Sequence, residues 1–371
     1  MYASLRRTAG LCAATAATAA TATFATHCAA DTPLSTTTTA STASTASTQS
    51  PPAAPSSSAS PSVCVVGSSN IDLIAYVARA PGPGETIAGH AFEQGFGGKG
   101  ANQAVIAARL GTRTVMVSKV GPDQFGRDTV ANYEANGVDA AHVSVAGAGV
   151  PTGVAPIVVE DSGENRIIIV GGANNKLTPA DVEAARPALR GSRVMLTQCE
   201  VPMETTEAAL RLAREEGIVA VFNPAPAPPG GVPASVMALA DIIAPNETEA
   251  ALLTGLAPET TETLEGAKAA GRLLLDRGSK SVLMTRGAKG CLYMTRKGGG
   301  EVAVVIPGTV LSRDKVIDTS GAGDCFLGSF AHYVASGLEV AEAAHRACAV
   351  AAISVQSHGT QTSYPAKGTV Q

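Results

Sequence analysis

The 371-residue sequence has no long hydrophobic run and little charge. Because it lacks any stretch of about 18 or more consecutive apolar residues, no segment is expected to span a membrane. Charged residues make up 16% of the chain and the net charge is -4, which argues against a nucleic-acid partner, since that would need a basic face. The 45% hydrophobic content, with abundant Ala, Val and Gly, is typical of a globular α/β protein.

Paired cysteines and metal-binding spacings are also missing. The seven cysteines are odd in number and scattered, with no Cys-x-x-Cys pair. That pattern fits neither a disulfide framework nor a zinc site, and it suits a reducing compartment such as the cytoplasm. The six histidines show no metal-ligand spacing. No G-x-x-x-x-G-K-[ST] motif occurs, which excludes a P-loop nucleotidase.

The first 62 residues differ in composition from the rest. They are almost entirely Ala, Thr, Ser and Pro, and such a segment buries too little apolar surface to fold, so we expect disorder. Arg6 and Arg7 precede the first acidic residue, Asp31, which resembles an organelle transit peptide. The alternative is an unprocessed extension, or a start codon placed too far upstream. One domain is expected over residues 63–371.

From Val63 onwards, short apolar runs alternate with helical patterns. Strand-like runs lie at 63–67, 114–117, 194–196, 218–222, 242–244 and 281–285. Helical patterns lie at 101–110, 128–136, 179–189, 205–216, 247–253 and 263–277. This alternation predicts an α/β fold with a doubly wound, mostly parallel sheet flanked by helices and with ligands at the C-terminal strand ends.

Two segments, 74–93 and 150–176, break this rhythm. They show alternating polarity and turn residues, as in the pair of runs 155–160 and 166–170, which is typical of hairpins. Two β insertions in an α/β core predict a small sheet over the active site. Such a lid would exclude water from the reaction.

The stretch Asp318-Thr-Ser-Gly-Ala-Gly-Asp324 leads directly into a helix-like segment. Two glycines at the start of a helix leave backbone N–H groups open, and the helix N-terminus carries partial positive charge, so an anion site is predicted there. Asp324 would stand beside a bound phosphate, where accepting a proton or serving a metal makes its charge useful. The alternative is a plain N-cap. We interpret the adjacent Cys325 as a small buried residue, not a nucleophile.

Polar residues also follow other predicted strands. Asn70 and Asp72 would point to the same side, which suits a polyol, although a local turn explains them as well. Glu200 stands at the end of another strand. The segment Gly95–Gly100 matches G-x-G-x-x-G but does not follow the first buried strand, so we reject a dinucleotide site. Gly98–Asn102 is better interpreted as a loop that approaches a small polar ligand.

Two further segments each have two interpretations. Asn246 and Glu249 open a helix with the pattern of a capping box, or Glu249 holds Mg²⁺ through waters. The Gly-rich, basic loop Thr285–Gly290 contacts nucleotide phosphates, or it only turns a hairpin into the segment that starts at Cys291.

Taken together, Gly97–Ala104 and Asp318–Asp324 resemble the two signatures of the ribokinase-type (PfkB) sugar kinases. The first, in its Lys-Gly-Ala-Asn-Gln form, is more similar to ribokinase than to fructokinase or adenosine kinase. Further matching motifs follow in the family's order at 67–72, 83–86, 198–200 and 246–249, and the resemblance spans residues 63–364. It implies a Rossmann-like α/β kinase core with a β lid that often forms a homodimer clasp. It also implies transfer of a phosphoryl group from ATP to the 5-hydroxyl of D-ribose.

The resemblance assigns a role to each matching residue. Asp324 would be the base that takes the proton from the sugar hydroxyl, and the amides of Gly321, Ala322 and Gly323 would form the anion hole. The pentose would be held by Asn70, Asp72, Gly98, Lys99, Gly100, Ala101, Asn102, Glu200 and Asp324. ATP would contact Asn246, Thr285, Arg286, Gly287, Ala288, Lys289, Gly290, Gly323 and Asp324. Asn246 and Glu249 would organise the Mg²⁺ region.

A monovalent cation, K⁺, is also implied beside the anion hole. Its oxygen ligands would come from Asp318, Ser320, Ser354, Ser357, Gly359 and Ser363. Cys348 stands where the family more often has Asn or His near the adenine.

Other functions stay open. Another sugar or nucleoside kinase of the family is one, since lid residues such as Ala91 and Ile168 could shift specificity. A catalytically silent ligand-binding protein is another, although retention of Asp324 beside Gly-Ala-Gly argues against it. A nicotinamide-dependent oxidoreductase would need tight NAD binding without ATP binding.

Overall fold

The computed structural model describes residues 63–369. The expected disordered extension and targeting segment, residues 1–62, lie outside the described residues. Within 63–369, no helix combines the length and the apolar character that a membrane crossing requires.

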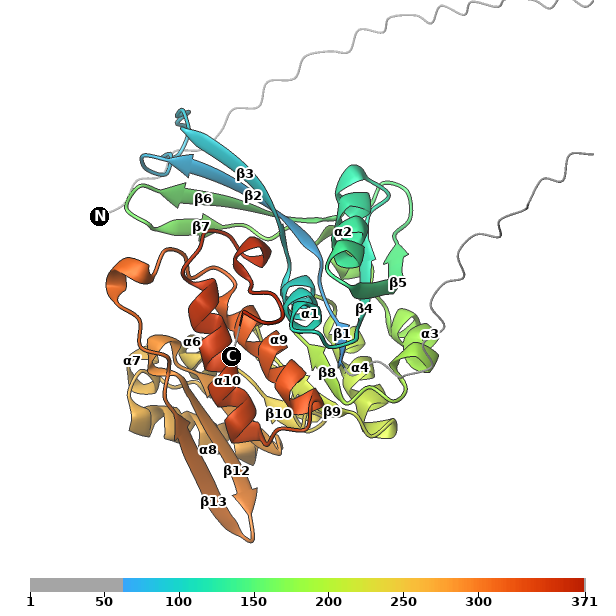
Figure 1. Ribbon diagram of the computed structural model, residues 1–371, viewed down its shortest axis with the longest axis vertical. Coiled ribbons are helices and arrows are strands. Elements are labelled where there is room, and N and C mark those ends of the chain that lie inside the picture. The colour runs from blue at the N-terminus through green and yellow to red at the C-terminus, as the bar shows by residue number, and fades with distance from the viewer. Residues whose placement is uncertain (1–62, 370–371) are drawn as a thin grey trace, which may run out of the picture. The chain divides into compact units, whose positions relative to one another are not determined.

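The main sheet has nine strands in the order β13-β12-β11-β10-β9-β8-β1-β4-β5 (Figure 1). These are β1 (Val63–Val66), β4 (Thr114–Val120), β5 (Val138–Val145), β8 (Val194–Thr197), β9 (Val219–Phe222), β10 (Ile242–Ile243), β11 (Ser281–Thr285), β12 (Cys291–Lys297) and β13 (Gly300–Ile306). All neighbours from β5 to β11 are parallel, and β12 and β13 add an antiparallel edge. The central strands β1 and β8 are buried at every residue, which is why they read as unbroken apolar runs.

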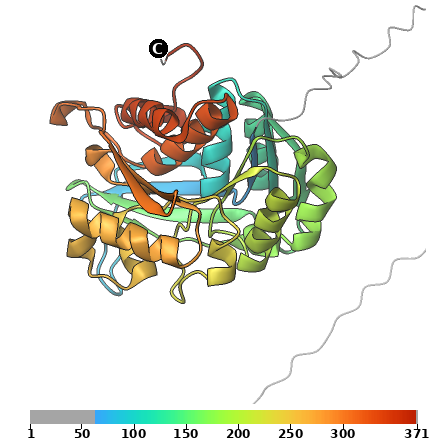
Figure 2. The same cartoon turned by 90° about the horizontal axis from the view of Figure 1, so that it is seen from below.

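Helices cover both faces of this sheet, as the view in Figure 2 shows. One face carries α1 (Lys99–Arg109), α2 (Gln124–Ala135), α9 (Ala322–Ala335) and α10 (Val340–Ser354). The other carries α3 (Pro179–Leu189), α4 (Met203–Glu215), α5 (Ala234–Met237), α6 (Glu247–Thr254), α7 (Pro258–Thr261) and α8 (Leu264–Asp276). Each face has its own hydrophobic core. The predicted doubly wound α/β architecture is confirmed.

A separate small sheet has the order β3-β2-β6-β7, with β2 (Asn70–Val77), β3 (Ala91–Gly97), β6 (Gly153–Glu160) and β7 (Asn165–Ile167). It extends beyond the C-terminal end of β1 (Figure 1). A second sheet of this kind was expected, but its limits differ. It starts at Asn70, because Asn70 already pairs with Gly97 and Gly153, and residues 172–176 form a 3-10 helix outside it.

Buried polar side chains fix the turn that joins the two sheets. The Ser69 hydroxyl lies 2.6 Å from the Tyr133 hydroxyl and 2.8 Å from that of Ser118. The Asn174 amide accepts from the Ser69 N–H at 2.8 Å and donates to the Asn70 side-chain oxygen at 2.7 Å. All of these groups are buried, so the direction in which β2 leaves β1 is set by hydrogen bonds that have no competition from water.

Candidate active site

A cavity of 210 Å³ opens at the C-terminal ends of β9, β10 and β11. This is the edge of a parallel sheet at which ligands are expected. The lining residues are Lys99, Asn223, Ala225, Ala244, Asn246, Glu249, Thr285, Thr319, Gly321, Ala322, Gly323, Asp324 and Leu327. Many of them are sequence-predicted site residues, and they come from elements far apart in the chain.

The anion motif forms the N-terminus of α9 at this cavity. Gly321 is the N-cap, with φ of 69°, so the alternative that Asp324 caps the helix is wrong. A Cβ on Gly321 would lie 2.3 Å from Thr360 Cγ2 and 2.7 Å from the Tyr364 hydroxyl, whereas a Cβ on Gly323 would meet nothing within 4 Å. Gly321 is therefore required by the backbone and its neighbours, while Gly323 leaves the space in front of the helix open.

Asp324 lies in the first turn of α9 and is 7% exposed. Asn102 Nδ2 donates to its Oδ2 at 3.0 Å, and Gln103 Nε2 donates to its Oδ1 at 2.9 Å. Both carboxylate oxygens keep free lone pairs, because each can accept two hydrogen bonds. The group is therefore held in place and can still accept a proton from a molecule in the cavity. The neighbouring Cys325 is fully buried, as predicted.

Further carboxyl groups surround Asp324. Burial raises the pKa of Asp72 to about 7, and the negative charges of Glu200 and Asp324 add to the rise. Burial also raises the pKa of Glu249. Burial alone would lower the pKa of Lys99, but Asp324, Glu200 and Glu249 outweigh it and hold that pKa above its usual value. Lys99 is thus a cation within an acidic cluster.

The residues predicted to hold a sugar come together beside this cluster. Glu200 Oε2 accepts from the Ser68 hydroxyl at 2.6 Å and from the Lys99 N–H at 3.0 Å, which ties the end of β8 to the start of α1. A Cβ on Gly97 would lie 2.2 Å from Asp72 Oδ1, so the glycine makes room for that carboxyl group. Asn70 is buried, with its side-chain oxygen bonded to Asn174.

The start of α1 packs closely against the turn after β1. Gly98 has φ of 90°, and a Cβ on Gly100 would lie 2.6 Å from the Ser68 nitrogen. Ala101 is buried in the core, so its side chain faces away from solvent.

The residues predicted to contact a nucleotide divide into two groups. Asn246 and Glu249 form the capping box of α6, with bonds of 2.7 and 2.8 Å, and both also line the cavity. Thr285 lines the cavity too.

The rest of the loop that starts at Thr285 behaves differently. Arg286 and Lys289 pair with Glu247 at 3.2 and 3.0 Å, and this loop turns β11 into the antiparallel β12. Gly287 and Ala288 form its 3-10 turn with Lys289, and Gly290 follows with φ of 90°. Cys348 is buried on α10, and a hydrogen bond from the Cys291 thiol lowers its pKa.

The predicted K⁺ ligands lie on two adjacent segments. Asp318 accepts from the N–H groups of Ser320 and Gly359, both at 2.8 Å. The hydroxyls of Ser354 and Ser363 bond to carbonyls of their own turns, and Ser357 is exposed. Among residues 63–369, no cluster of three or more His, Cys, Asp or Glu side chains is suited to a metal ion. The nearby oxygens are mainly hydroxyls and carbonyls, a donor set that fits an alkali cation.

Several polar groups at the site were not predicted. Asn223 directly follows β9 and lines the cavity, so the strand-end rule that pointed to Asn70 would also have found it. Gln198 bonds to Gln103, and Gln361 bonds to Asn102. Gln103 and Gln198 stand within matching motifs but were given no role, and Gln361 carries no sequence signal. Their roles depend on which helices pack together.

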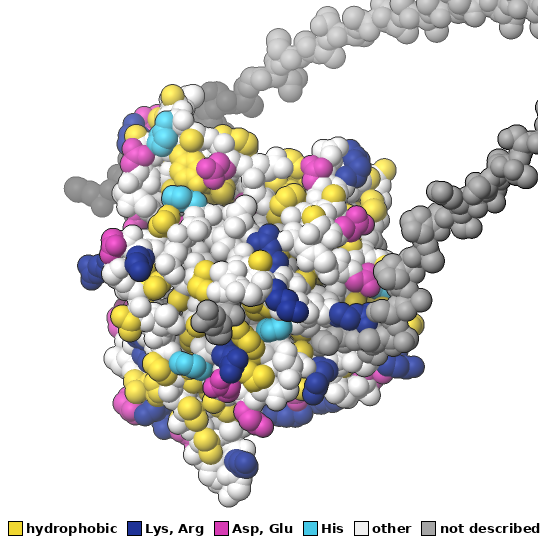
Figure 3. Space-filling model, viewed as in Figure 1, with side chains coloured by type: hydrophobic (Ala, Val, Ile, Leu, Met, Phe, Trp, Pro, Cys, Tyr) yellow, Lys and Arg dark blue, Asp and Glu magenta, His cyan; other side chains and the backbone are white. Residues whose placement is uncertain are grey.

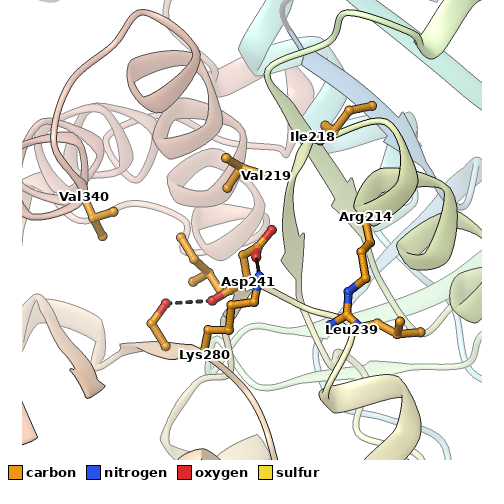
Figure 4. A pocket seen from close by; sticks show the side chains of 10 residues that line it. Arg214, Ile218, Val219, Leu239, Asp241, Lys280 and Val340 are labelled. Atoms are coloured by element: carbon orange, nitrogen blue, oxygen red, sulfur yellow. Dashed lines mark hydrogen bonds and ion pairs between the residues drawn. The ribbon is translucent and has the colours of Figure 1, made fainter. Parts of the chain in front are cut away.

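A larger cavity of 460 Å³ lies at the opposite ends of the same strands (Figure 4). Its charged groups already have partners: Lys280 pairs with Asp241 at 2.5 Å, and Arg214 donates to the Ala238 carbonyl. Val340, the first residue of α10, also lines this cavity, but none of the site residues predicted from the sequence does. The smaller, polar cavity around Asp324 is therefore the candidate active site.

The two glycines of the anion motif should respond differently to alanine. We expect Gly321→Ala to lower the free energy of unfolding by roughly 2–5 kcal/mol, from left-handed strain and overpacking. Gly323→Ala should leave it unchanged or raise it by up to about 1 kcal/mol, because Ala favours a helix. Urea unfolding measures both. Equal destabilisation by the two substitutions would contradict this assignment.

The raised pKa of Asp72 predicts a pH-dependent stability. Its folded pKa is about 7 against an ordinary 3.8, so the native state binds the extra proton between these values and stability falls as the pH rises through them. Asp72→Asn should therefore raise the free energy of unfolding at pH 8, by roughly 2–4 kcal/mol, and change it little at pH 3. The exposed Asp314→Asn serves as the control. An equal effect of Asp72→Asn at both pH values would refute the prediction.

Known proteins resemble this chain along the whole described region. The family model described as pfkB family carbohydrate kinase matches residues 60–367. The chain is 41% identical over 308 residues to a ribokinase of Mus musculus, covering 82% of this chain and 92% of the relative. It is 40% identical over 306 residues to a deoxyribokinase of Salmonella typhi, covering 82% and 95%. A solved structure of Arabidopsis thaliana ribokinase, complexed with ribose and ATP, matches with a TM-score of 0.72 and 32% identity, covering 84% and 97%. The chain therefore belongs to the pfkB family of carbohydrate kinases.

Proposed function

We propose that this kinase transfers the γ-phosphoryl group of ATP to the 5-hydroxyl of D-ribose, giving ribose 5-phosphate and ADP. The observation that carries the proposal is the buried Asp324 carboxylate beside the open amides at the N-terminus of α9. A base and an anion site then face the same cavity. The Arabidopsis relative that was solved with ribose and ATP supports this choice of substrates.

Each part of the cavity has a task in this reaction. Asp324 accepts the proton of the 5-hydroxyl as its oxygen attacks the γ-phosphorus, and the leaving group is ADP. The amides of Gly321, Ala322 and Gly323 stabilise the negative charge on the oxygens of the transferring group. The positive end of α9 adds to that stabilisation. The proton leaves Asp324 to solvent when the product departs.

The sugar is held by Asp72, Glu200 and the loop at the start of α1, residues 98–102. Carboxyl groups accept hydrogen bonds from neighbouring hydroxyls, which favours a polyol. The small sheet lies beside these groups and limits access of water, which would otherwise accept the phosphoryl group. Deoxyribose phosphorylation is the second candidate, favoured by the 40% identity to the Salmonella deoxyribokinase.

Two cations fit the residues at hand. Glu249 and Asn246 line the cavity where the phosphates of ATP would lie, and Mg²⁺ held there through waters would neutralise phosphate charge. Asp318, Ser320, Ser354, Ser357, Gly359 and Ser363 would surround K⁺, whose charge would strengthen the anion site. Cys348 would lie towards the adenine.

Turnover with a panel of substrates tests the proposal. The full chain is assayed for ADP release with ribose, 2-deoxyribose, fructose, adenosine or no sugar, in K⁺ and in Na⁺. We expect ribose to give the highest kcat/KM and K⁺ to enhance it. Asp324→Asn should lower kcat by roughly 10²–10⁴-fold because the base is lost.

Other outcomes of this assay are equally informative. A higher kcat/KM for 2-deoxyribose would replace the ribose assignment. ATP binding without turnover on any sugar would refute catalysis.

We further propose that the small sheet joins two copies of the chain. Hydrophobic side chains gather over its strands (Figure 3). Phe92 is 66% exposed and Ile168 is 65% exposed, although both are large and apolar. An exposed apolar group of this kind marks an interaction surface. A homodimer through the two small sheets would cover it.

Sedimentation velocity tests this arrangement. Ile168→Asp should convert a dimer into a monomer, because a charge would be buried without a partner. Val305→Asp, at an exposed apolar residue on β13, is the control and should leave the dimer intact. A wild-type protein that sediments as a monomer at all concentrations would rule the dimer out.

A further inference from the structure

Gln103 lies on α1 next to Asn102, and its side chain is completely buried. Its Nε2 donates to Asp324 Oδ1 at 2.9 Å and to Asn223 Oδ1 at 3.4 Å, and its Oε1 accepts from Gln198 Nε2 at 2.7 Å. The side chain therefore uses both its donor and its acceptor, and one of its partners is the proposed base.

The neighbours allow only one orientation of this amide. A carboxylate accepts and never donates, so Nε2 must face Asp324. Asn223 Nδ2 donates to the Ala244 carbonyl at 2.8 Å, which leaves its Oδ1 to face the same nitrogen. Gln198 supplies the donor on the other side. The partners on α9 and at the ends of β8 and β9 therefore fix which side of the Gln103 amide carries Nε2.

Asn102 holds the second oxygen of Asp324 in the same manner. Its Nδ2 donates to Oδ2 at 3.0 Å, while its Oδ1 accepts from Gln361 Nε2 at 3.0 Å. Gln361 Oε1 in turn accepts from Asn132 Nδ2 at 2.8 Å. Consecutive residues of α1 therefore hold both carboxylate oxygens, which fixes the rotamer of Asp324.

Most of the titratable groups around Asp324 are acidic, unlike the two amides that bond to it. The titratable groups around it are Asp72, Lys99, Glu249, Cys325 and Tyr364. Lys99 is the one cation among these groups, and the other four are acids. Hydrogen bonds to a carboxylate favour its ionised form. Unlike a carboxyl group, the Gln103 amide has no acidic proton that it could share with Asp324.

We propose that Gln103 is a positioning residue that keeps Asp324 ionised and directed at the sugar hydroxyl. Gln198 and Asn223 hold its amide in the orientation that this requires. The inference rests on the proposed function of Asp324 as the base. It adds a residue that acts on the reaction through Asp324 and not through contact with a substrate.

Two substitutions in the full chain test the inference. Gln103→Met keeps the length of the side chain and removes the donor. We expect kcat to fall about tenfold to a hundredfold, with KM for sugar and ATP changed less than about twofold. The acid limb of the kcat profile should move to higher pH. Gln103→Glu should move that limb further, because two adjacent carboxyl groups share a proton.

A matched control separates this role from packing. Thr205 is fully buried away from the cavity, and its hydroxyl donates to the Leu177 carbonyl at 2.7 Å. Thr205→Val also removes one buried hydrogen bond, so it should lower the melting temperature and leave the pH profile unchanged. An unshifted pH profile in both Gln103 variants, whatever their melting temperatures, would overturn the inference. If Asp324→Asn retained full turnover, the proposed function itself would fail first.

Discussion

The close contact between α1 and α9 is the constraint on which the candidate active site depends. A Cβ on Gly328 would lie 2.3 Å from both the Gln103 carbonyl oxygen and Ile106 Cγ2, so the two helices approach this closely only because residue 328 is glycine. That approach brings the amides of α1 within hydrogen-bond distance of Asp324. It also directs the N-termini of α1 and α9, each with its partial positive charge, towards one region.

Carboxyl groups in this region have different environments and therefore suit different tasks. Asp72 and Glu249 are partly buried, and the loss of solvent raises the pKa of both carboxyl groups. Asp324 instead receives two amide donors. Glu200 is bonded to the Lys99 backbone and the Ser68 hydroxyl, so it also joins β8 to α1. Glu200, a proposed sugar ligand, thus also holds the backbone of the site together.

Local structure and proposed chemistry are not alternatives at this site. The pattern Asn246 to Glu249 was open to two interpretations, a capping box or a cation region, and the structure forms the box while both side chains still line the cavity. The loop after β11 was also open to two interpretations, a hairpin turn or a contact with nucleotide phosphates. Its hairpin interpretation holds, and Arg286 and Lys289 pair with Glu247, which leaves Thr285 at the cavity. A basic residue in a Gly-rich loop is therefore weak information until its acidic neighbours are known.

The sequence by itself determined the α/β class, the parallel central strands, the existence of the small sheet and the anion motif. These depend on short-range patterns: unbroken apolar runs for strands buried on both faces, alternation for hairpins, and glycines before a helix. The helix α10 and the edge strands β5 and β13 were not predicted, because an Ala-rich helix and half-exposed edges have weak periodicity. Only the tertiary structure decided which side chains support Asp324. Gln361 lies 259 residues from Asn102 and Asn174 lies 105 from Ser69, and no local pattern connects residues that meet only when distant helices pack.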